Sequence, residues 1–405
     1  MPTYVKQDGT ADSKTINNAL ILAAADDNII IIQDSATYGT SSGGESDFST
    51  GIGDAITGTI NHNFQLRADV GMRPVFDGTG CYGTLINFDF KDDIIFQGIT
   101  IKEFGNGNSG IIGAHHSENL LIANCTIFGP SYNTRLFHRA NSNNSAKPIT
   151  VQHCYFFNAA TNYYQSLPHN VIVQDCLYVS TGSSYPTPIV RLEGEGCGAI
   201  NVTCVVDNQS HTIMAVSGAY NCVAVTTREF GSNWGKAFDV DEAYNCVAFH
   251  ANTEFVVTAG GAKVDCIEAF ASGSTWGDMF VDFSGSNLTP ADGGYLHETG
   301  LTTGSGTDLS GSVRVVPYDI GAYEVDVCAF WTGFTDDTEE KFAENFIINK
   351  ANNGRQELSR RAGCTNPVIN RPPAGATIRG SWSLRNRKKP YLATQGSQTP
   401  DDITN

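Results

Sequence analysis

Residues 120–128 read LLIANCTIF, and residues 149–157 repeat the pattern as ITVQHCYFF. A third copy, VIVQDCLYV, occupies residues 171–179. Each copy contains β-prone residues, a polar turn residue, a cysteine and then alternating apolar residues. Such a repeat predicts short strands that stack on one another, because one strand–turn–strand unit cannot bury its apolar face alone.

Weaker copies extend the repeat in both directions. They read IIFQGITI at 94–101, INVTCVV at 200–206, NCVAV at 221–225, NCVAF at 245–249 and DCIEA at 265–269. The turn positions, at 98, 124, 153, 175, 203, 221, 245 and 265, are therefore 18 to 29 residues apart. This variation places the length differences in loops, which we predict at 129–148, 158–169 and 180–199. The fold class is then all-β, a right-handed parallel β-helix in which the cysteines point inward and stack.

Both ends of the repeat carry helix signals. Ile16, Ala19, Leu20 and Ala23 share one face of a helix over 13–25, which Asp12 or Ser13 can cap. Residues 338–352 predict a second helix, with acidic residues in its first turn and a glycine after its end. We therefore expect an N-terminal cap with a short helix (1–27), a parallel β-helix (28–327), a C-terminal helical cap (328–354) and a basic extended docking tail (355–405).

Composition limits the classes of protein that the chain can belong to. Hydrophobic residues make up 40% of the 405, enough for a large core, and the apolar runs are too short to insert into a membrane. The first residues, MPTYVKQD, have no basic or apolar region, which predicts synthesis in a cytoplasm without a signal peptide. The eleven cysteines include no Cys-x-x-Cys pair, so we expect free thiols, no metal site and no cofactor.

The C-terminal segment differs in charge from the rest of the chain. The whole chain has a net charge of −17, yet residues 355–391 hold nine Lys or Arg against one acidic residue, a net of +8. A basic segment with few apolar residues predicts docking on an acidic protein surface, in preference to nucleic acid. The residues expected to dock are Arg371, Arg379, Trp382, Arg385, Arg387, Lys388 and Lys389.

Several stretches resemble a known group of proteins. They are DGTAD at 8–12, NIIIIQD at 28–34, RPVFDG at 73–78 and YDIGAYE at 318–324. They are similar to the N-terminal cap, the following strands and the closing coil of the pectate-lyase-like β-helix superfamily, including bacterial and phage members. The resemblance covers roughly residues 1–326 and implies the fold, which serves both polysaccharide-cleaving enzymes and virion parts. The catalytic signatures of its lyases and polygalacturonases have no counterpart here, so no enzyme role transfers.

Two groups of residues are candidates for sites. Glu193 with Glu195, or Asp239 with Asp241, could form the carboxyl pair of a glycosidase; the alternative is that all four are solvated surface carboxylates. A second group of aromatic and histidine residues could form a sugar-stacking platform, and consists of Tyr132, His138, Tyr163, Tyr164 and His169.

Together these observations lead to one expected function and two alternatives. We expect a structural or host-contacting virion protein of a tailed bacteriophage, such as a β-helical spike, fibre or decoration protein. It would be anchored by its C-terminal tail to other virion proteins, self-associate, for example as a trimer, and contact host surface polysaccharide. The alternatives are a polysaccharide depolymerase, acting as glycoside hydrolase or lyase, and a non-viral bacterial filament or surface protein. On these residues a non-enzymatic role is favoured.

Overall fold

The computed structural model describes most of the first 324 residues and four short strands beyond them. The described residues are 1–24, 28–39, 48, 54–56, 60–79, 81, 83–104, 110–129, 134–161, 168–180, 189–206, 212–226, 236–249, 253–267, 279–282, 287–291, 296–297, 299–304, 306–314, 318–324, 346–350, 356–360, 380–383 and 390–393. The chain forms two compact units. The first comprises Met1–Ser310 and Arg314–Glu324, and the second comprises Gly311–Val313 and Val325–Asn405.

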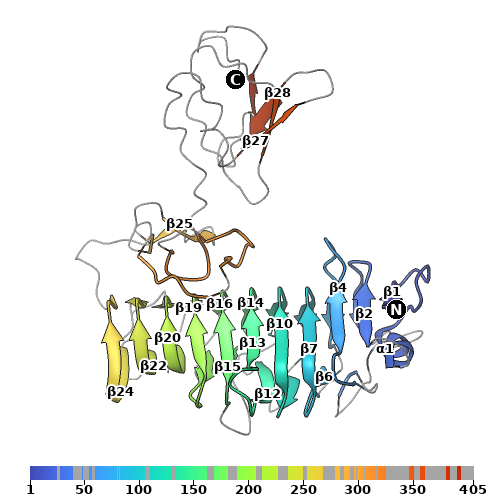
Figure 1. Ribbon diagram of the computed structural model, residues 1–405, viewed down its shortest axis with the longest axis horizontal. Coiled ribbons are helices and arrows are strands. Elements are labelled where there is room, and N and C mark those ends of the chain that lie inside the picture. The colour runs from blue at the N-terminus through green and yellow to red at the C-terminus, as the bar shows by residue number, and fades with distance from the viewer. Residues whose placement is uncertain are drawn as a thin grey trace. The chain divides into compact units, whose positions relative to one another are not determined.

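The first unit is a parallel β-solenoid (Figure 1). Sheet 1 contains β1 (Thr3–Val5), β2 (Ile29–Ile32), β4 (Gln65–Ala68), β7 (Asp92–Gln97), β10 (Glu118–Ala123), β13 (Ile149–Gln152), β15 (Val171–Gln174), β17 (Val190–Leu192), β18 (Gly198–Ile200), β20 (Met214–Tyr220), β22 (Lys236–Tyr244) and β24 (Thr253–Val264). All its strand pairs are parallel, as in the pairing of Ile122 with Val151. The predicted parallel solenoid is confirmed.

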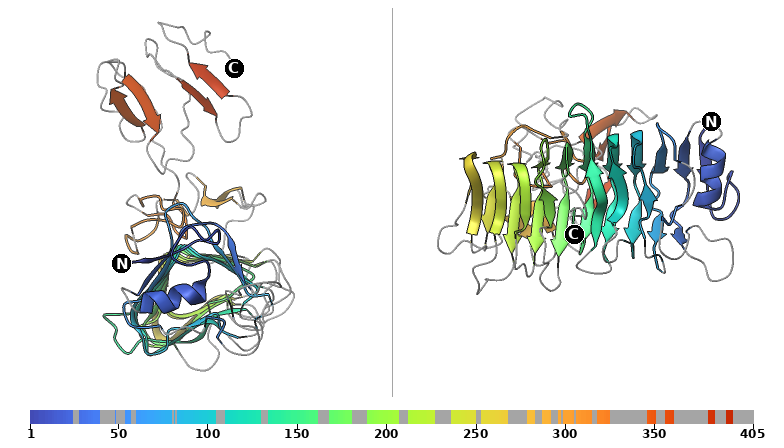
Figure 2. Two further views of the ribbon diagram at one scale, coloured as in Figure 1. Left: turned by 90° about the vertical axis from the view of Figure 1, so that its right-hand side faces the viewer. Right: turned by 90° about the horizontal axis from the view of Figure 1, so that it is seen from below.

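Two further parallel sheets complete the three sides of the solenoid (Figure 2). Sheet 2 contains β3 (Thr37–Gly39), β5 (Val75–Asp77), β8 (Thr100–Lys102), β11 (Thr126–Phe128), β14 (Tyr155–Phe157), β16 (Leu177–Ser180), β19 (Thr203–Val206), β21 (Val223–Thr226) and β23 (Val247–Phe249). Sheet 3 contains β6 (Ile86–Asn87), β9 (Gly110–His115) and β12 (Arg135–Asn141). Isolated bridges, such as Asn141 with His169, extend sheet 3 to later coils.

The corner between sheets 1 and 2 explains the sequence repeat. Its residues have left-handed backbone, with φ between 49° and 53°, in Asn124, His153, Asp175, Asn201, Asn221, Asn245 and Asp265. Asn and Asp tolerate this conformation better than most residues, which is why they occupy six of these seven corners. One turn was predicted two residues late, at 203, and lies at Asn201.

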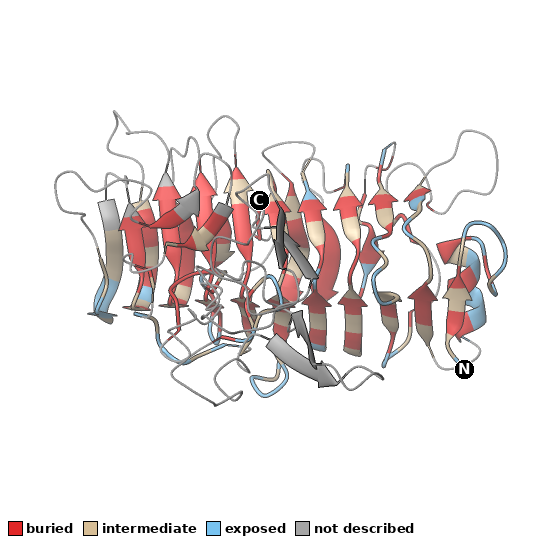
Figure 3. Ribbon diagram, turned by 90° about the horizontal axis from the view of Figure 1, so that it is seen from above, coloured by how far each residue is buried: buried red, intermediate tan, exposed pale blue. Residues whose placement is uncertain are grey.

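The residue that follows each corner points into the core. Five of the cysteines there are at most 1% exposed, and they are Cys125, Cys154, Cys176, Cys222 and Cys246. Val202 fills this position in the coil that lacks such a cysteine. Figure 3 shows the buried residues continuing from strand to strand along the solenoid. The predicted inward orientation is confirmed for these five cysteines, and all nine cysteines in the described ranges are free.

The N-terminal helix covers the first coil. Helix α1 (Ile16–Ala24) buries Ile16, Ala19, Leu20 and Ala23, which are the four predicted residues. Its cap differs from the prediction: the Thr15 hydroxyl accepts a hydrogen bond from Asn18 N (3.3 Å), while Asp12 accepts one from Tyr4 N (2.9 Å). No helix in the described part of the chain is long and apolar enough to cross a membrane.

The described residues of 279–310 and 314–324 pack on the outer face of sheet 2. They include β25 (Phe280–Asp282), β26 (Asn287–Pro290) and an irregular part, the described residues of 296–310 and 314–324, which we call the strap. Phe280, Leu288, Leu296, Ile320 and Ala322 form a second apolar cluster with outward-facing residues of sheet 2 such as Val205 and Val223. The YDIGAYE stretch, expected as a closing coil, therefore lies across sheet 2 instead.

A buried ion-pair cluster holds the strap. The Arg314 guanidinium donates to Asp175 Oδ1 (2.9 and 3.1 Å), Glu324 Oε2 (2.9 Å) and the Gly321 carbonyl (2.8 Å). The side chains of Arg314 and Asp175 are fully buried, and that of Glu324 is 4% exposed. Asp175 occupies a corner position that is Asn in the next three coils, so this cluster links the strap to the repeat.

In the second unit the structure describes two antiparallel strand pairs. They are β27 (Phe346–Lys350) with β28 (Gln356–Arg360), and β29 (Gly380–Ser383) with β30 (Pro390–Ala393). The helix predicted over 338–352 lies partly outside the described residues, and its described part is the strand β27. Of the predicted docking residues, Trp382 lies in β29. The others, Arg371, Arg379, Arg385, Arg387, Lys388 and Lys389, lie outside the described residues.

Candidate functional site

The predicted carboxyl pairs lie at the surface, and a cation engages one member of each pair. Glu193 Oε2 is 2.8 Å from Arg191 Nε, and Asp239 Oδ2 is 2.8 Å from Lys236 Nζ. Glu195 and Asp241 are exposed. A catalytic pair needs two carboxyl groups in different protonation states, which pairing with a cation at the surface does not favour.

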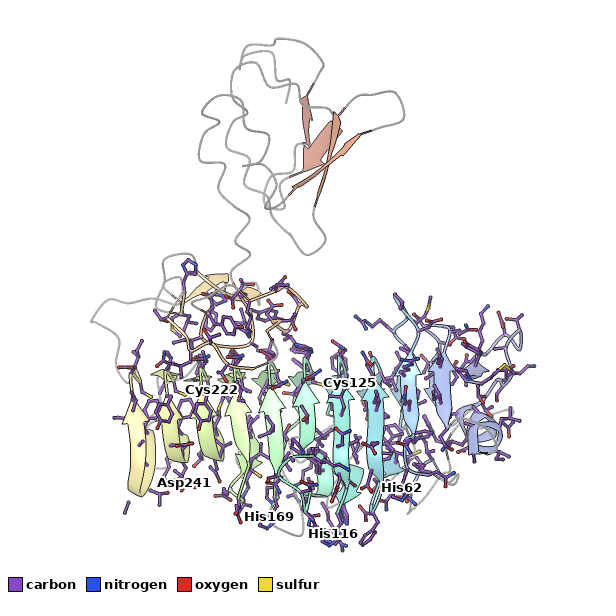
Figure 4. All side chains as sticks on the ribbon, in the orientation of Figure 1. His62, His116, Cys125, His169, Cys222 and Asp241 are labelled. Carbon is purple, nitrogen blue, oxygen red and sulfur yellow. The ribbon has the colours of Figure 1, made fainter. Side chains whose placement is uncertain are left out.

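The predicted aromatic platform is only partly described. Three of its members lie outside the described residues, namely Tyr132, Tyr163 and Tyr164. His138 lies in β12, and His169 forms an isolated β-bridge with Asn141. Figure 4 shows His169 on the edge of the solenoid that also carries His62, His116 and Asp241. This edge is the border where sheet 3 leads into sheet 1, since His116 connects β9 to β10.

An aromatic cluster that the sequence did not reveal occupies this edge. The Phe90 ring lies 5.5 Å from the His115 ring and 5.3 Å from the His116 ring, centroid to centroid, and the two histidine rings are 3.9 Å apart. Phe90 is 61% exposed and has left-handed backbone with φ 60°. A bulky residue in this conformation is strained, and such strain concentrates at functional sites.

Polar side chains fix the backbone that carries the three rings. Asp89 Oδ1 accepts a hydrogen bond from His115 N (2.7 Å), and Asn87 Oδ1 accepts one from Asp89 N (2.8 Å). Asn141 Oδ1 accepts a hydrogen bond from His116 N at 2.7 Å. We call Asn87, Asp89, Phe90, His115, His116 and Asn141 the ring site. Its side chains come from three successive coils, so only the folded solenoid assembles it.

One ring-site histidine is biased towards its neutral form. Partial burial lowers the pKa of His115, and the charges of His116 and Arg139 lower it further, against the opposing effect of Asp89. The lowered pKa favours the neutral imidazole of His115, which can both donate and accept a hydrogen bond. Such a group suits a hydroxyl-bearing ligand better than a purely anionic one.

A half-buried carboxyl group adjoins the ring site. Burial raises the pKa of Asp54, as does the charge of Asp89, while a hydrogen bond from Asn87 and the charge of His138 act in the opposite direction. Gly113 leaves room for these groups, since a Cβ there would lie 2.7 Å from Asn87 Oδ1 and 3.2 Å from Asp89 Oδ1. A raised pKa favours the protonated form of Asp54, and a carboxyl group biased in this way beside a second carboxyl group is suited to donate a proton.

The arrangement suits a sugar ligand. An exposed aromatic face stacks on the apolar side of a sugar ring, and neighbouring Asp, Asn and His side chains hydrogen-bond its hydroxyl groups. In the described part of the chain no group of three His, Cys, Asp or Glu side chains could hold a metal ion.

Sequence reasoning missed the ring site because its members are not periodic. Phe90 and Asp89 stand in the connection before β7, and the pair His115 and His116 stands between two strands. The available signal was an aromatic residue followed one coil later by two consecutive histidines. Comparison with known proteins finds no family whose sequence pattern matches the chain and no curated relative that matches it significantly.

Proposed function

We propose that this protein is a non-enzymatic, glycan-contacting structural protein, and that the ring site binds the glycan. The exposed Phe90 ring, held in a strained backbone conformation against two histidines, carries this proposal. A solenoid offers a stiff scaffold on which coils far apart in sequence present side chains on one face. Glu193 and Asp239 each pair with a cation, which favours a role in binding over a role in catalysis for these surface carboxylates.

The proposal extends to a biological setting. A right-handed, pectate-lyase-like β-helix without catalytic signatures fits a spike, fibre or decoration protein of a tailed bacteriophage that contacts host surface polysaccharide. The basic segment 355–391, with its net charge of +8, would anchor it to an acidic surface of other virion proteins, and self-association as a trimer would raise its avidity. Deleting residues 355–405 tests the anchor: the truncated protein should keep its Tm and lose assembly, and loss of the fold would refute it.

An array of purified bacterial capsular and O-chain polysaccharides, neutral and anionic, tests the binding role. We expect at least one to bind, and Phe90→Ala to weaken binding about fivefold, since a stacking contact contributes about 1 kcal/mol. Phe128→Ala is the matched control, because Phe128 is also exposed (39%) but lies on sheet 2. Equal effects of the two substitutions, or no binding by the wild type, would contradict the proposal.

One observation favours polysaccharide cleavage as a second candidate function. The raised pKa of Asp54 next to Asp89 suits a hydrolysis in which Asp54 protonates the glycosidic oxygen as its bond to the anomeric carbon breaks. Water would add to that carbon and give a proton to Asp89. Release of reducing ends from the bound polysaccharide, falling about 100-fold in Asp54→Asn, would establish this activity. Binding without release would leave the non-enzymatic role.

A further inference from the structure

We infer that the stacked thiols of Cys246 and Cys266 form an oxidation site, which a hydroperoxide converts to a disulfide. The site is independent of the proposed glycan contact. The two cysteines follow the corners of the last two coils that the structure describes, next to β24, at the end of the solenoid opposite α1 (Figure 1). Oxidation would therefore join these two coils covalently.

The strand register places the two cysteines side by side. Tyr244 pairs with Val264 just before them, and Val247 pairs with Ile267 just after them, both in parallel. Neighbouring strands lie about 4.8 Å apart, which is inside the range of about 4.4–6.8 Å between the Cα atoms that a disulfide joins. The backbone needs no large movement to accept the bond.

The two thiols also point in the same direction. Cys246 Sγ lies 3.4 Å from the Ala219 carbonyl oxygen of the preceding coil, and Cys266 Sγ lies 3.5 Å from the corresponding Ala243 carbonyl oxygen. Each thiol also donates to the carbonyl two residues before it, at 3.4 and 3.3 Å respectively. Because the contacts repeat one coil apart, the sulfur atoms stack, and the thiol of Cys246 donates to Cys266 Sγ.

The two thiols differ in access and acidity, which gives each a distinct role. Cys246 is 0% exposed, whereas Cys266 is partly buried beside the exposed Val264 and Asp265. The hydrogen bond from the Cys246 thiol lowers the pKa of Cys266 to about 7, with help from the charge of Lys263, while burial raises the pKa of Cys246. Cys266 is therefore the thiolate that meets the oxidant, and Cys246 is the thiol that resolves it.

The reaction balances with a hydroperoxide such as hydrogen peroxide as the oxidant. The Cys266 thiolate attacks a peroxide oxygen, so an S–O bond forms, the O–O bond breaks, and hydroxide departs and is protonated to water. The sulfur of Cys246 then attacks the resulting sulfenic acid, so the S–S bond forms and the S–O bond breaks. The departing hydroxide takes the thiol proton of Cys246 and leaves as water. The two sulfur atoms lose two electrons, and the peroxide gains them.

The thiols in the middle of the solenoid have the same stacking without the same access. Cys154 N donates to Cys176 Sγ at 3.4 Å, and Cys125, Cys154 and Cys176 are each at most 1% exposed. Burial raises the pKa of Cys125 and Cys154 well above the ordinary value. These cysteines should therefore remain thiols under the same oxidant, which makes them a control within the same molecule.

Peptide mass spectrometry without reduction tests the site in the full chain after treatment with hydrogen peroxide. Trypsin cuts after Lys263, between the two cysteines, so the disulfide would link peptide 237–263 to peptide 264–314. A disulfide between Cys125 and Cys154 would link peptide 103–135 to peptide 148–191. We expect the first linked pair to form at least about tenfold faster than the second. Equal rates, or no link between 237–263 and 264–314, would overturn the site.

Two serine variants separate the roles of the thiols. Cys246→Ser removes the resolving thiol, so the sulfenic acid should persist at Cys266 and be captured there by dimedone. Cys222→Ser is the matched control, because Cys222 is equally buried (0%) and stacks on the other side of Cys246. This variant should form the disulfide as the wild type does. Loss of the disulfide from a Cys222→Ser protein that keeps its circular dichroism spectrum would contradict direct reaction of Cys246 with Cys266.

The disulfide should also hold the last described coil more firmly. Ile267 N donates to the Cys246 carbonyl (2.9 Å), so exchange of this amide hydrogen requires the two coils to separate. We expect exchange at Ile267 to slow about tenfold after oxidation and to recover with dithiothreitol. Unchanged exchange in protein that carries the disulfide would overturn the joining of the coils.

Discussion

Replacement of Arg314 by alanine should destabilise the solenoid more than loss of any surface ion pair. The substitution removes every hydrogen bond that the guanidinium makes and leaves Asp175 and Glu324 buried, with side chains 0% and 4% exposed. Breaking a buried pair by removing one partner costs about 3–5 kcal/mol. At about 2 °C per kcal/mol for a domain of this size, the Tm should fall by about 6–10 °C.

Arg191→Ala provides the matched comparison, since Arg191 pairs with Glu193 at the surface, where both side chains are more than one third exposed. That substitution should cost less than about 1 kcal/mol. Urea and thermal denaturation measure both losses. Hydrogen exchange at the amides of Leu301 and Gly321, which bond to Asn221, reports whether the strap detaches first.

A double variant separates the loss of contacts from the cost of an unpaired charge. Asp175→Asn in the Arg314→Ala background removes one buried carboxylate. It places at this corner the residue type that Asn201 and Asn221 provide at the same corner of later coils, so it should recover part of the lost stability. A cost for Arg314→Ala no larger than that of Arg191→Ala would refute the reasoning. So would further destabilisation by the second substitution.

Three more outcomes are expected. Hydrogen bonds from the thiol and backbone of Cys246 lower the pKa of Cys266 to about 7, whereas burial raises the pKa values of Cys125 and Cys154. Iodoacetamide in native conditions should therefore label Cys266 before Cys125 or Cys154. Equal labelling of the three cysteines, measured by peptide mass spectrometry, would contradict this. The folded-state pKa of Asp54 lies above its ordinary 3.8, so folding is penalised above the raised pKa and the penalty fades as pH falls through it. Asp54→Asn should therefore raise the Tm at pH 7 and lose that gain near pH 3, whereas a pH-independent change would point to packing. Asn221→Ala removes the hydrogen bonds of the side chain to Asn201, Leu301 N and the Leu301 carbonyl, and alanine tolerates φ 52° poorly, so the free energy of unfolding should fall by about 2–4 kcal/mol. Asn221→Gly loses the same hydrogen bonds but keeps the backbone conformation, so it should lower the free energy of unfolding by less. The reverse order in urea denaturation would contradict the role of the backbone.

The parts of the fold that the sequence predicts are those fixed by local rules. A polar residue with left-handed backbone followed by a small buried residue recurs in each coil, and α1 buries the four residues that its period identifies. Sheet 3 was missed because β12 does not alternate. Leu136 and Phe137 are consecutive and both buried, and a bulge follows between Phe137 and Arg139, so its range was expected to be a loop.

The strap and the ring site depend on contacts between distant residues. Arg314 meets Asp175 139 residues away, and nothing in its own neighbourhood distinguishes it from a surface arginine. Phe90 reaches His115 and His116 only because β7 and β10 stack in register, as Ile94 and Leu120 do. The predicted site residues Glu193 and Asp239 were chosen by composition, and composition does not show that a cation engages each of them.

The route of the strap has a consequence for how the solenoid comes apart. From Thr299 to Thr307 it meets Asn245, Asn221, Asn201 and His153 in turn, in the reverse of their order in the chain. A stack of coils held only by nearest neighbours can fray from its open end, one coil at a time. Here the last coils cannot leave singly, because the strap ties them to coils nearer the middle. The C-terminal half should therefore lose its structure as one cooperative block, while the first coils, beyond the reach of the strap, open independently.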